Sequence, residues 1–181
     1  MTTMHPPVPD EELELPLDAR FGPYGRMLLA VCKTAAVAGS LVFTALVAMS
    51  IISITGRKIW SAPVPGDVEL LQMCAAFAAA NFFAYCHLNR GDVKVDFFTA
   101  RLSRPALHRL EAFGSLLYAI VASALAWRTL VGALGVRAAG ETSVILGWPI
   151  WIAQLMMVPG FVLMALAGAY MAFAHWRLAR E

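Results

Sequence analysis

Four long stretches without Asp, Glu, Lys or Arg constrain the fold of this chain more than any other feature. They run from Thr34 to Gly56, Leu70 to Asn89, Ala112 to Trp127 and Thr142 to Trp176. A helix needs about 20 apolar residues to cross the hydrocarbon core of a bilayer, and the third stretch reaches this length by including Leu110 and Leu130. Because 60% of the residues are hydrophobic and only 14% are charged, the composition excludes a water-soluble domain.

We therefore predict an all-α integral membrane protein with four transmembrane helices, over about residues 30–55, 68–88, 108–131 and 149–175. Residues 27–181 form this membrane domain, and residues 1–26, which are acidic and rich in proline, form a flexible cytoplasmic tail. The five tryptophans agree with these limits, because an indole ring favours the membrane interface and all five lie at or near predicted helix ends: Trp60, Trp127, Trp148, Trp151 and Trp176.

Basic residues predict the orientation of the four helices. The N-terminal flank, the loop after the second stretch and the C-terminus together contain ten Lys and Arg residues. The opposite side contains four, which are Arg57, Lys58, Arg128 and Arg137. Because cytoplasmic loops are enriched in Lys and Arg, both termini and the central loop are expected in the cytoplasm. The net charge of +2 is explained by this topology and gives no indication of nucleic acid binding.

The uncharged stretches offer little chemistry for transport. An acidic or basic residue inside the bilayer usually marks a solute path. None of the four stretches contains Asp, Glu, Lys or Arg, which argues against an independent transporter of the small multidrug type. Asn81 is the most central amide, and it either makes an interhelical hydrogen bond or lines a shared path. Ala75 with Ala79, and Ala76 with Ala80, recur at helical spacing and predict close packing against another helix.

Histidines, cysteines and catalytic motifs are the features that could indicate a cofactor or an enzyme. Three histidines lie at the ends of predicted helices: His87, His108 and His175. This position argues against haem, which in a helical bundle is usually ligated within the helices. A membrane anchor of a redox complex remains the alternative function. The chain has no G-x-S-x-G or P-loop motif, and we predict neither an enzyme nor a bound cofactor. The cysteines show no disulfide or metal spacing and are expected to be free thiols: Cys32, Cys74 and Cys86.

The segment HLNRGDVKVDFF, residues 87–98, ends the second predicted helix. Arg90 complements the helix C-terminus, and Gly91 can take the left-handed conformation that closes it. Asp96 is expected to cap a short interfacial helix between the second and third membrane helices. Arg90, Asp92 and Asp96 would hold this turn together, with Arg90 and Asp96 as an ion pair. The segment is either a solvated interfacial linker or a docking surface for a partner subunit.

Three short motifs resemble the small membrane subunit of tripartite ATP-independent periplasmic (TRAP) transporters, the DctQ-like family. They are PGDVELLQ at 65–72, RGDVKVDFF at 90–98 and GETSVILGWP at 140–149, and the resemblance covers about Lys33 to Trp176. In that family the turn after the second helix commonly has glycine, a polar residue that is often histidine, an aliphatic residue, any residue, then Val-Asp. Residues 91–96 match this pattern, except that Asp92 stands where histidine is common, which suggests a subgroup.

The resemblance implies a non-catalytic small permease subunit of a secondary transporter, a symporter for an organic acid, in a bacterial or archaeal inner membrane. Its partners would be a large DctM-like membrane subunit, which contains the substrate and sodium sites, and a DctP-like periplasmic binding protein. The small subunit would act as a static buttress that enlarges the scaffold of the large subunit. It would also help to receive the binding protein.

Several charged or polar residues are candidates for these contacts on the predicted periplasmic side. Arg57, Lys58, Asp67 and Glu69 either meet a partner or serve as helix caps and interfacial anchors. Glu141 and Thr142 precede the fourth helix, where they either tie that loop by hydrogen bonds or lie in solvent. No site of catalysis, metal binding or cofactor binding is predicted.

Overall fold

The computed structural model describes residues 22–61, 63–89, 91 and 104–180, and this part of the chain consists mainly of four long helices. They are α3 (Pro23–Trp60), α4 (Asp67–Leu88), α5 (Arg104–Ala139) and α6 (Ile150–Leu178). Each is long enough and apolar enough to cross a membrane, which confirms the prediction of four membrane helices. The interfacial helix expected after Asp96, and all but the last residues of the tail expected at 1–26, lie outside the described residues.

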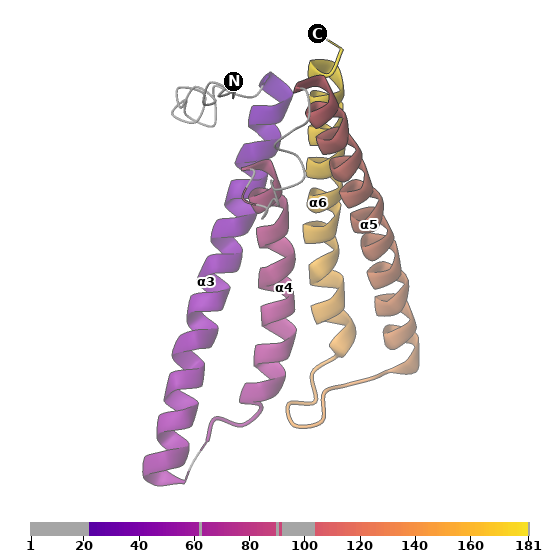
Figure 1. Ribbon diagram of the computed structural model, residues 1–181. Coiled ribbons are helices and arrows are strands. Elements are labelled where there is room, and N and C mark those ends of the chain that lie inside the picture. The colour runs from indigo at the N-terminus through magenta and orange to yellow at the C-terminus, as the bar shows by residue number, and fades with distance from the viewer. Residues whose placement is uncertain (1–21, 62, 90, 92–103, 181) are drawn as a thin grey trace.

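The four helices lie side by side, in the order α3, α4, α6, α5 (Figure 1). Consecutive helices run in opposite directions, so α3 and α5 begin where α4 and α6 end. We call this the upper end, as it is drawn in Figure 1, and the opposite end the lower end. The turn between α3 and α4 and the loop between α5 and α6 both lie at the lower end. Two connections that are far apart in sequence are therefore neighbours in space.

The helices extend beyond the predicted spans, most clearly α3 with 38 residues and α5 with 36. At 1.5 Å per residue each is about 55 Å long, well above the roughly 30 Å of a hydrocarbon core. The hydropathy pattern marks only the part that crosses lipid, whereas Lys and Arg are good helix formers and continue the helix past it. At its start α3 has Pro23 in the first turn, and at its end Ser61 takes a left-handed conformation with φ 54°.

Small residues bring the backbones of neighbouring helices together. A Cβ atom added at Gly39 in α3 would lie 3.2 Å from the carbonyl oxygen of Ala78 in α4. One added at Gly160 in α6 would lie 2.8 Å from the carbonyl carbon of Ala80. Gly168 makes a similar approach to α5, with 3.0 Å to the backbone nitrogen of Ala119. These contacts are van der Waals packing of the kind that holds helices together in lipid.

Small residues of α4 pack against both neighbours, in a pattern that differs in part from the expected pairs. Ala80 is buried against α6, as the predicted spacing implied, but Ala79 is exposed. The deeply buried alanines of α4 are Ala78, Ala80 and Ala84. The buried alanines do not follow a single line of the helix surface because α4 lies between α3 and α6 and contacts both of them.

Asn81 is buried in α4, facing the Gly39 contact with α3. Its side-chain amide donates a hydrogen bond of 2.8 Å to the carbonyl oxygen of Phe77. This bond runs within α4 and not between helices, so it satisfies the amide locally. The close approach of Gly39, rather than a polar bond from Asn81, brings α3 and α4 together here.

Candidate functional site

The lower end contains a polar network that joins α3 to the start of α4. Ser53, fully buried in α3, donates a hydrogen bond of 2.5 Å to Oδ2 of Asp67. The same hydroxyl oxygen accepts a bond of 3.2 Å from the backbone amide of Val64 in the connecting turn. Arg57, one turn further along α3, lies 3.4 Å from Oδ2 of Asp67. One carboxylate thus fixes the end of one helix to the beginning of the next.

Asp67 also contributes to the first turn of its own helix. Its Oδ1 accepts a bond of 2.8 Å from the amide of Val68. The negative charge lies where the exposed N–H groups of a helix favour it. The residue before it, Gly66, takes a left-handed conformation with φ 73°. Asp67 therefore has the position expected at the helix N-terminus, and in addition it contacts Arg57, a pairing that was not predicted from the sequence.

Glu69 binds the other lower-end connection, the loop between α5 and α6. Its two carboxylate oxygens accept hydrogen bonds from the backbone amides of Ile145 at 2.9 Å and Leu146 at 3.1 Å. Leu146 packs directly over Gly66, where an added Cβ would lie 2.5 Å from its Cγ. The loop between α5 and α6 is thus held on the N-terminus of α4 by a carboxylate and by a close apolar contact.

The loop between α5 and α6 has its own internal hydrogen bonds, centred on Ser143. The amide of Ser143 donates to the carbonyl oxygen of Trp148 at 2.8 Å, and its hydroxyl oxygen accepts from the amide of Trp148 at 3.2 Å. Gly147, with φ 67°, donates to the carbonyl of Ser143. The result is a closed turn that presents Val144 almost fully to the surroundings. The two ends of the turn also pair through an isolated antiparallel β-bridge between Thr142 and Pro149.

The remaining lower-end candidates have exposed side chains. Lys58 is exposed in the last turn of α3. Glu141 and Thr142 are exposed as well, and it is their backbones that tie the loop: the carbonyl of Glu141 accepts from the amide of Ile150 at 3.4 Å. The sequence did not single out Ser53, which binds Asp67 of the next helix, or Ser143, which binds Trp148 of its own loop.

A shallow cavity of about 360 Å³ lies beside these contacts, between the start of α4, the loop that joins α5 to α6, and the start of α6. Its lining includes Glu69 and Gln72 from α4, Thr142 and Ser143 from the loop, and Gln154 from α6. These five polar side chains line the cavity together with apolar residues such as Met73 and Ile150. They provide no pair of groups with the geometry of an acid, a base or a nucleophile acting together.

Residues 46–178 match the family model of the DctQ component of tripartite ATP-independent periplasmic transporters. The match includes the C-terminal part of α3, the other three helices and both lower-end connections. The chain belongs to the DctQ family. DctQ proteins are the small component of TRAP transporters, alongside DctM and DctP components, so this is a membrane protein of a transport system. The resemblance drawn from the sequence motifs is confirmed.

Comparison with curated proteins and with solved structures gives no match. The DctQ assignment is to a transporter component and gives no support to the alternative of an anchor for a redox complex. In this DctQ subunit, the hydrogen bonds of Asp67 to Ser53 and of Glu69 to the loop between α5 and α6 link the two lower-end connections through the start of α4.

At the upper end, only part of the segment expected to form the turn after α4 is described. The amide of Gly91 donates a bond of 3.0 Å to the carbonyl of Cys86, and the amide of Asn89 donates 3.1 Å to that of Tyr85, so carbonyls at the C-terminus of α4 are satisfied. Arg90, Asp92 and Asp96 lie outside the described residues.

An aromatic contact joins the upper part of α4 to α5. The ring of His87 stacks on the ring of Tyr118, with centroids 4.0 Å apart and an angle of 11° between planes. The hydroxyl of Tyr118 donates a bond of 3.1 Å to the carbonyl of Phe83. His87, one of the three histidines at predicted helix ends, therefore packs against another helix in this DctQ subunit.

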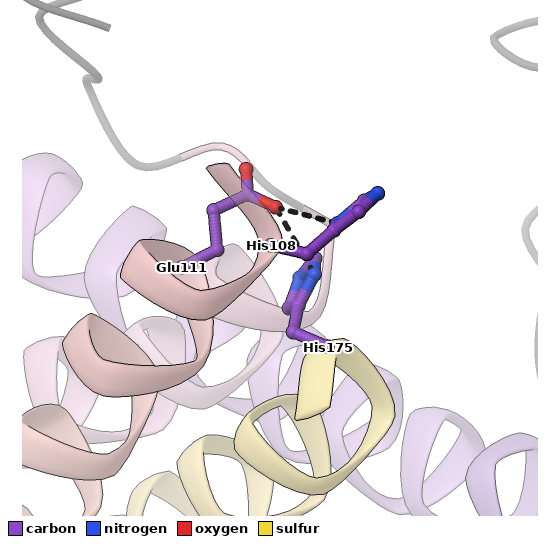
Figure 2. A group of neighbouring side chains, drawn as sticks. All are labelled: His108, Glu111 and His175. Carbon is purple, nitrogen blue, oxygen red and sulfur yellow. Dashed lines mark ion pairs between the residues drawn. The ribbon is translucent and has the colours of Figure 1, made fainter. Parts of the chain in front are cut away.

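The other two histidines at predicted helix ends come together with an acidic residue (Figure 2). Nδ1 of His175 in α6 lies 3.0 Å from Oε2 of Glu111 in α5, and Nδ1 of His108 lies 3.6 Å from the same oxygen. These residues could together hold a metal ion. From the sequence, no metal site was predicted. The available signal was that His108 and Glu111 lie three residues apart on one helix face, with His175 at the same predicted membrane side.

Proposed function

We propose that this DctQ subunit is a non-catalytic brace for the large DctM-like subunit of a TRAP transporter for an organic acid. In this proposal the large subunit moves the solute, and the small subunit extends the rigid scaffold against which that movement occurs. The coupling to an ion gradient belongs to the large subunit. The DctQ subunit adds packing surface in the membrane and a fixed polar end outside it.

The observation that carries this proposal is the apolar middle of all four helices. The four uncharged stretches fall mainly within the helices, and the described acidic and basic side chains lie toward the ends of the bundle. The polar groups that do occur in the middle are satisfied locally, as with Asn81 and the carbonyl of Phe77. A subunit of this kind can pack against other helices but offers an anion no charged binding group in the bilayer.

The outer faces of the helices supply the surface for such packing. Large apolar side chains are exposed along α3 and α5, among them Leu41, Ile51, Ile52, Phe113, Leu117 and Ile120. In a bilayer this surface is suited to lipid or to the helices of a larger subunit.

We place the upper end in the cytoplasm and the lower end in the periplasm. Ten of the 14 basic residues lie on the upper side of the predicted topology, which favours this orientation. The lower end would then face the binding protein. Its loop between α5 and α6 is held in one shape by Glu69 and Ser143, and this fixed shape supports a role in receiving a protein partner.

Co-purification from membranes tests the proposed function. A tagged copy, solubilised in mild detergent after co-expression with DctM and DctP components, should bring down a large polytopic membrane protein in equal amount. The same protein reconstituted alone in liposomes should give no uptake of organic acids. Uptake by this chain alone would refute the proposal.

Cysteine labelling tests the orientation separately. Val144→Cys at the lower end should react in intact spheroplasts with a maleimide that cannot cross membranes. Arg180→Cys at the upper end should react only after the membrane is opened. The unmodified chain, which has Cys32, Cys74 and Cys86, is the control for background labelling. The reverse pattern would place the termini outside.

A further inference from the structure

We infer that His108, Glu111 and His175 form a binding site for a divalent transition-metal ion, Zn²⁺ in the first instance, that joins α5 to α6 at the upper end. One donor atom from each residue lies within 4.8 Å of the donor atoms of the other two. In Figure 2 one carboxylate oxygen of Glu111 faces a ring nitrogen of each histidine. This inference is independent of the bracing role proposed above.

The distances fit a tetrahedral ion. Zinc binds histidine nitrogen at about 2.0–2.1 Å and carboxylate oxygen at about 2.0–2.2 Å, which places neighbouring donor atoms of a tetrahedron about 3.3 Å apart. The two measured separations from Oε2 of Glu111 are 3.0 Å to His175 and 3.6 Å to His108. The third separation, between the two histidines, is at most 4.8 Å, so binding an ion would require the histidine rings to turn closer together.

The chemistry of the donor set also favours zinc. Two imidazoles and one carboxylate match the preference of zinc for nitrogen and oxygen ligands, and three protein ligands leave one position for water. Hard ions such as Mg²⁺ and Ca²⁺ prefer sets made of oxygen alone. The carboxylate of Glu111 offsets part of the charge of the ion, which lowers the cost of holding it beside an apolar bundle.

The arrangement in the fold provides both rigidity and access. His175 is 2% exposed and packed between helices, so its ring is held in place. His108 has 30% of its side-chain surface exposed and lies in the second turn of α5, so an ion can reach the site from the aqueous side. His108 and Glu111 are three residues apart and project from one face of α5. Bound zinc would therefore cross-link the start of α5 to the end of α6.

Metal titration of purified, tag-free protein in detergent tests this inference. We expect one equivalent of Zn²⁺ per chain by calorimetry, a rise in melting temperature with added Zn²⁺, and, with Co²⁺ as a probe, the visible absorption bands of a tetrahedral site. His108→Ala and Glu111→Gln should each weaken zinc binding at least about tenfold. Both are chosen because their side chains are partly exposed, whereas His175→Ala removes a buried ring and threatens the fold.

A matched control removes a different histidine. His5→Ala takes away an imidazole from the N-terminal segment and should leave the zinc affinity unchanged. The inference is overturned if the unmodified protein binds no zinc at millimolar concentration. It is equally overturned if His108→Ala and Glu111→Gln bind zinc as tightly as the unmodified chain, because the ion would then lie elsewhere.

Discussion

Glu69 at the start of α4 binds the backbone amide of Ile145 at 2.9 Å, although 76 residues separate them in the sequence. Its second oxygen accepts from the next amide, that of Leu146. A single carboxylate therefore fixes the loop between α5 and α6 to the opposite half of the bundle. In a subunit proposed to be a rigid brace, this contact is what makes the lower end one surface rather than two independent turns.

Glu69→Gln should loosen the loop without unfolding the bundle. The amide keeps one carbonyl oxygen but replaces the second acceptor with a donor, so one of the two backbone bonds is lost. Hydrogen exchange by mass spectrometry should show faster exchange for a peptide containing residues 143–148. Glu141→Gln, whose side chain is exposed beside the same loop, is the control and should exchange like the original chain. Equal exchange in both variants would contradict the role assigned to Glu69.

Ser53→Ala should lower the melting temperature by several degrees. The change removes a buried hydroxyl that donates to Asp67 and accepts from the amide of Val64, leaving both groups without that partner. Thermal unfolding in detergent, followed by tryptophan fluorescence, provides the measurement. Thr55→Ala, two residues along on the exposed side of α3, should leave the transition where it is. A drop of the same size in both variants would mean that the network contributes nothing specific.

Gly160→Ala should destabilise the bundle by about 1–3 kcal/mol, because the new methyl group would lie 2.8 Å from the backbone of Ala80 and force α4 and α6 apart. Gly132→Ala in α5 is the control, because nothing lies within 4 Å of its added Cβ. There the gain in helix propensity, about 0.5–1 kcal/mol, should stabilise the protein. Unfolding in a graded denaturing detergent measures both, and opposite signs are the expected outcome.

Val144→Asp should reduce transport by the assembled system without affecting the fold of this subunit. The side chain is 95% exposed at the tip of the loop, so a charge there costs no internal packing. At an interface with a partner it would place an unpaired charge against an apolar surface. The measurement is uptake into cells that express all components, normalised to the amount of assembled complex. Val144→Thr, which keeps the shape, should transport normally, and unchanged uptake with Val144→Asp would remove this residue from the interface.

The membrane class, the four helices and the family could all be predicted from the sequence. The physical reason is that the hydrocarbon core requires long uncharged helical runs, and these are visible in any sequence that meets the requirement. The order of the motifs at residues 65–72, 90–98 and 140–149 then indicated the family, which the match over residues 46–178 confirms. Charge at the start of α4 was also visible, and Asp67 and Glu69 were candidates on that ground.

The tertiary structure alone decided which groups meet. Sequence predicts a helix, but not the rotation of that helix about its axis or the neighbour on each side. For this reason Ala79 is exposed while Ala78 is buried, and Asn81 bonds within its own helix. For the same reason Glu69 could be predicted as a helix-terminal acid but not as the anchor of a loop 76 residues away. The clearest case is the cluster of His108, Glu111 and His175. Their positions in the sequence cannot show that the beginning of α5 lies beside the end of α6, and only the packing of the two helices brings the three side chains together.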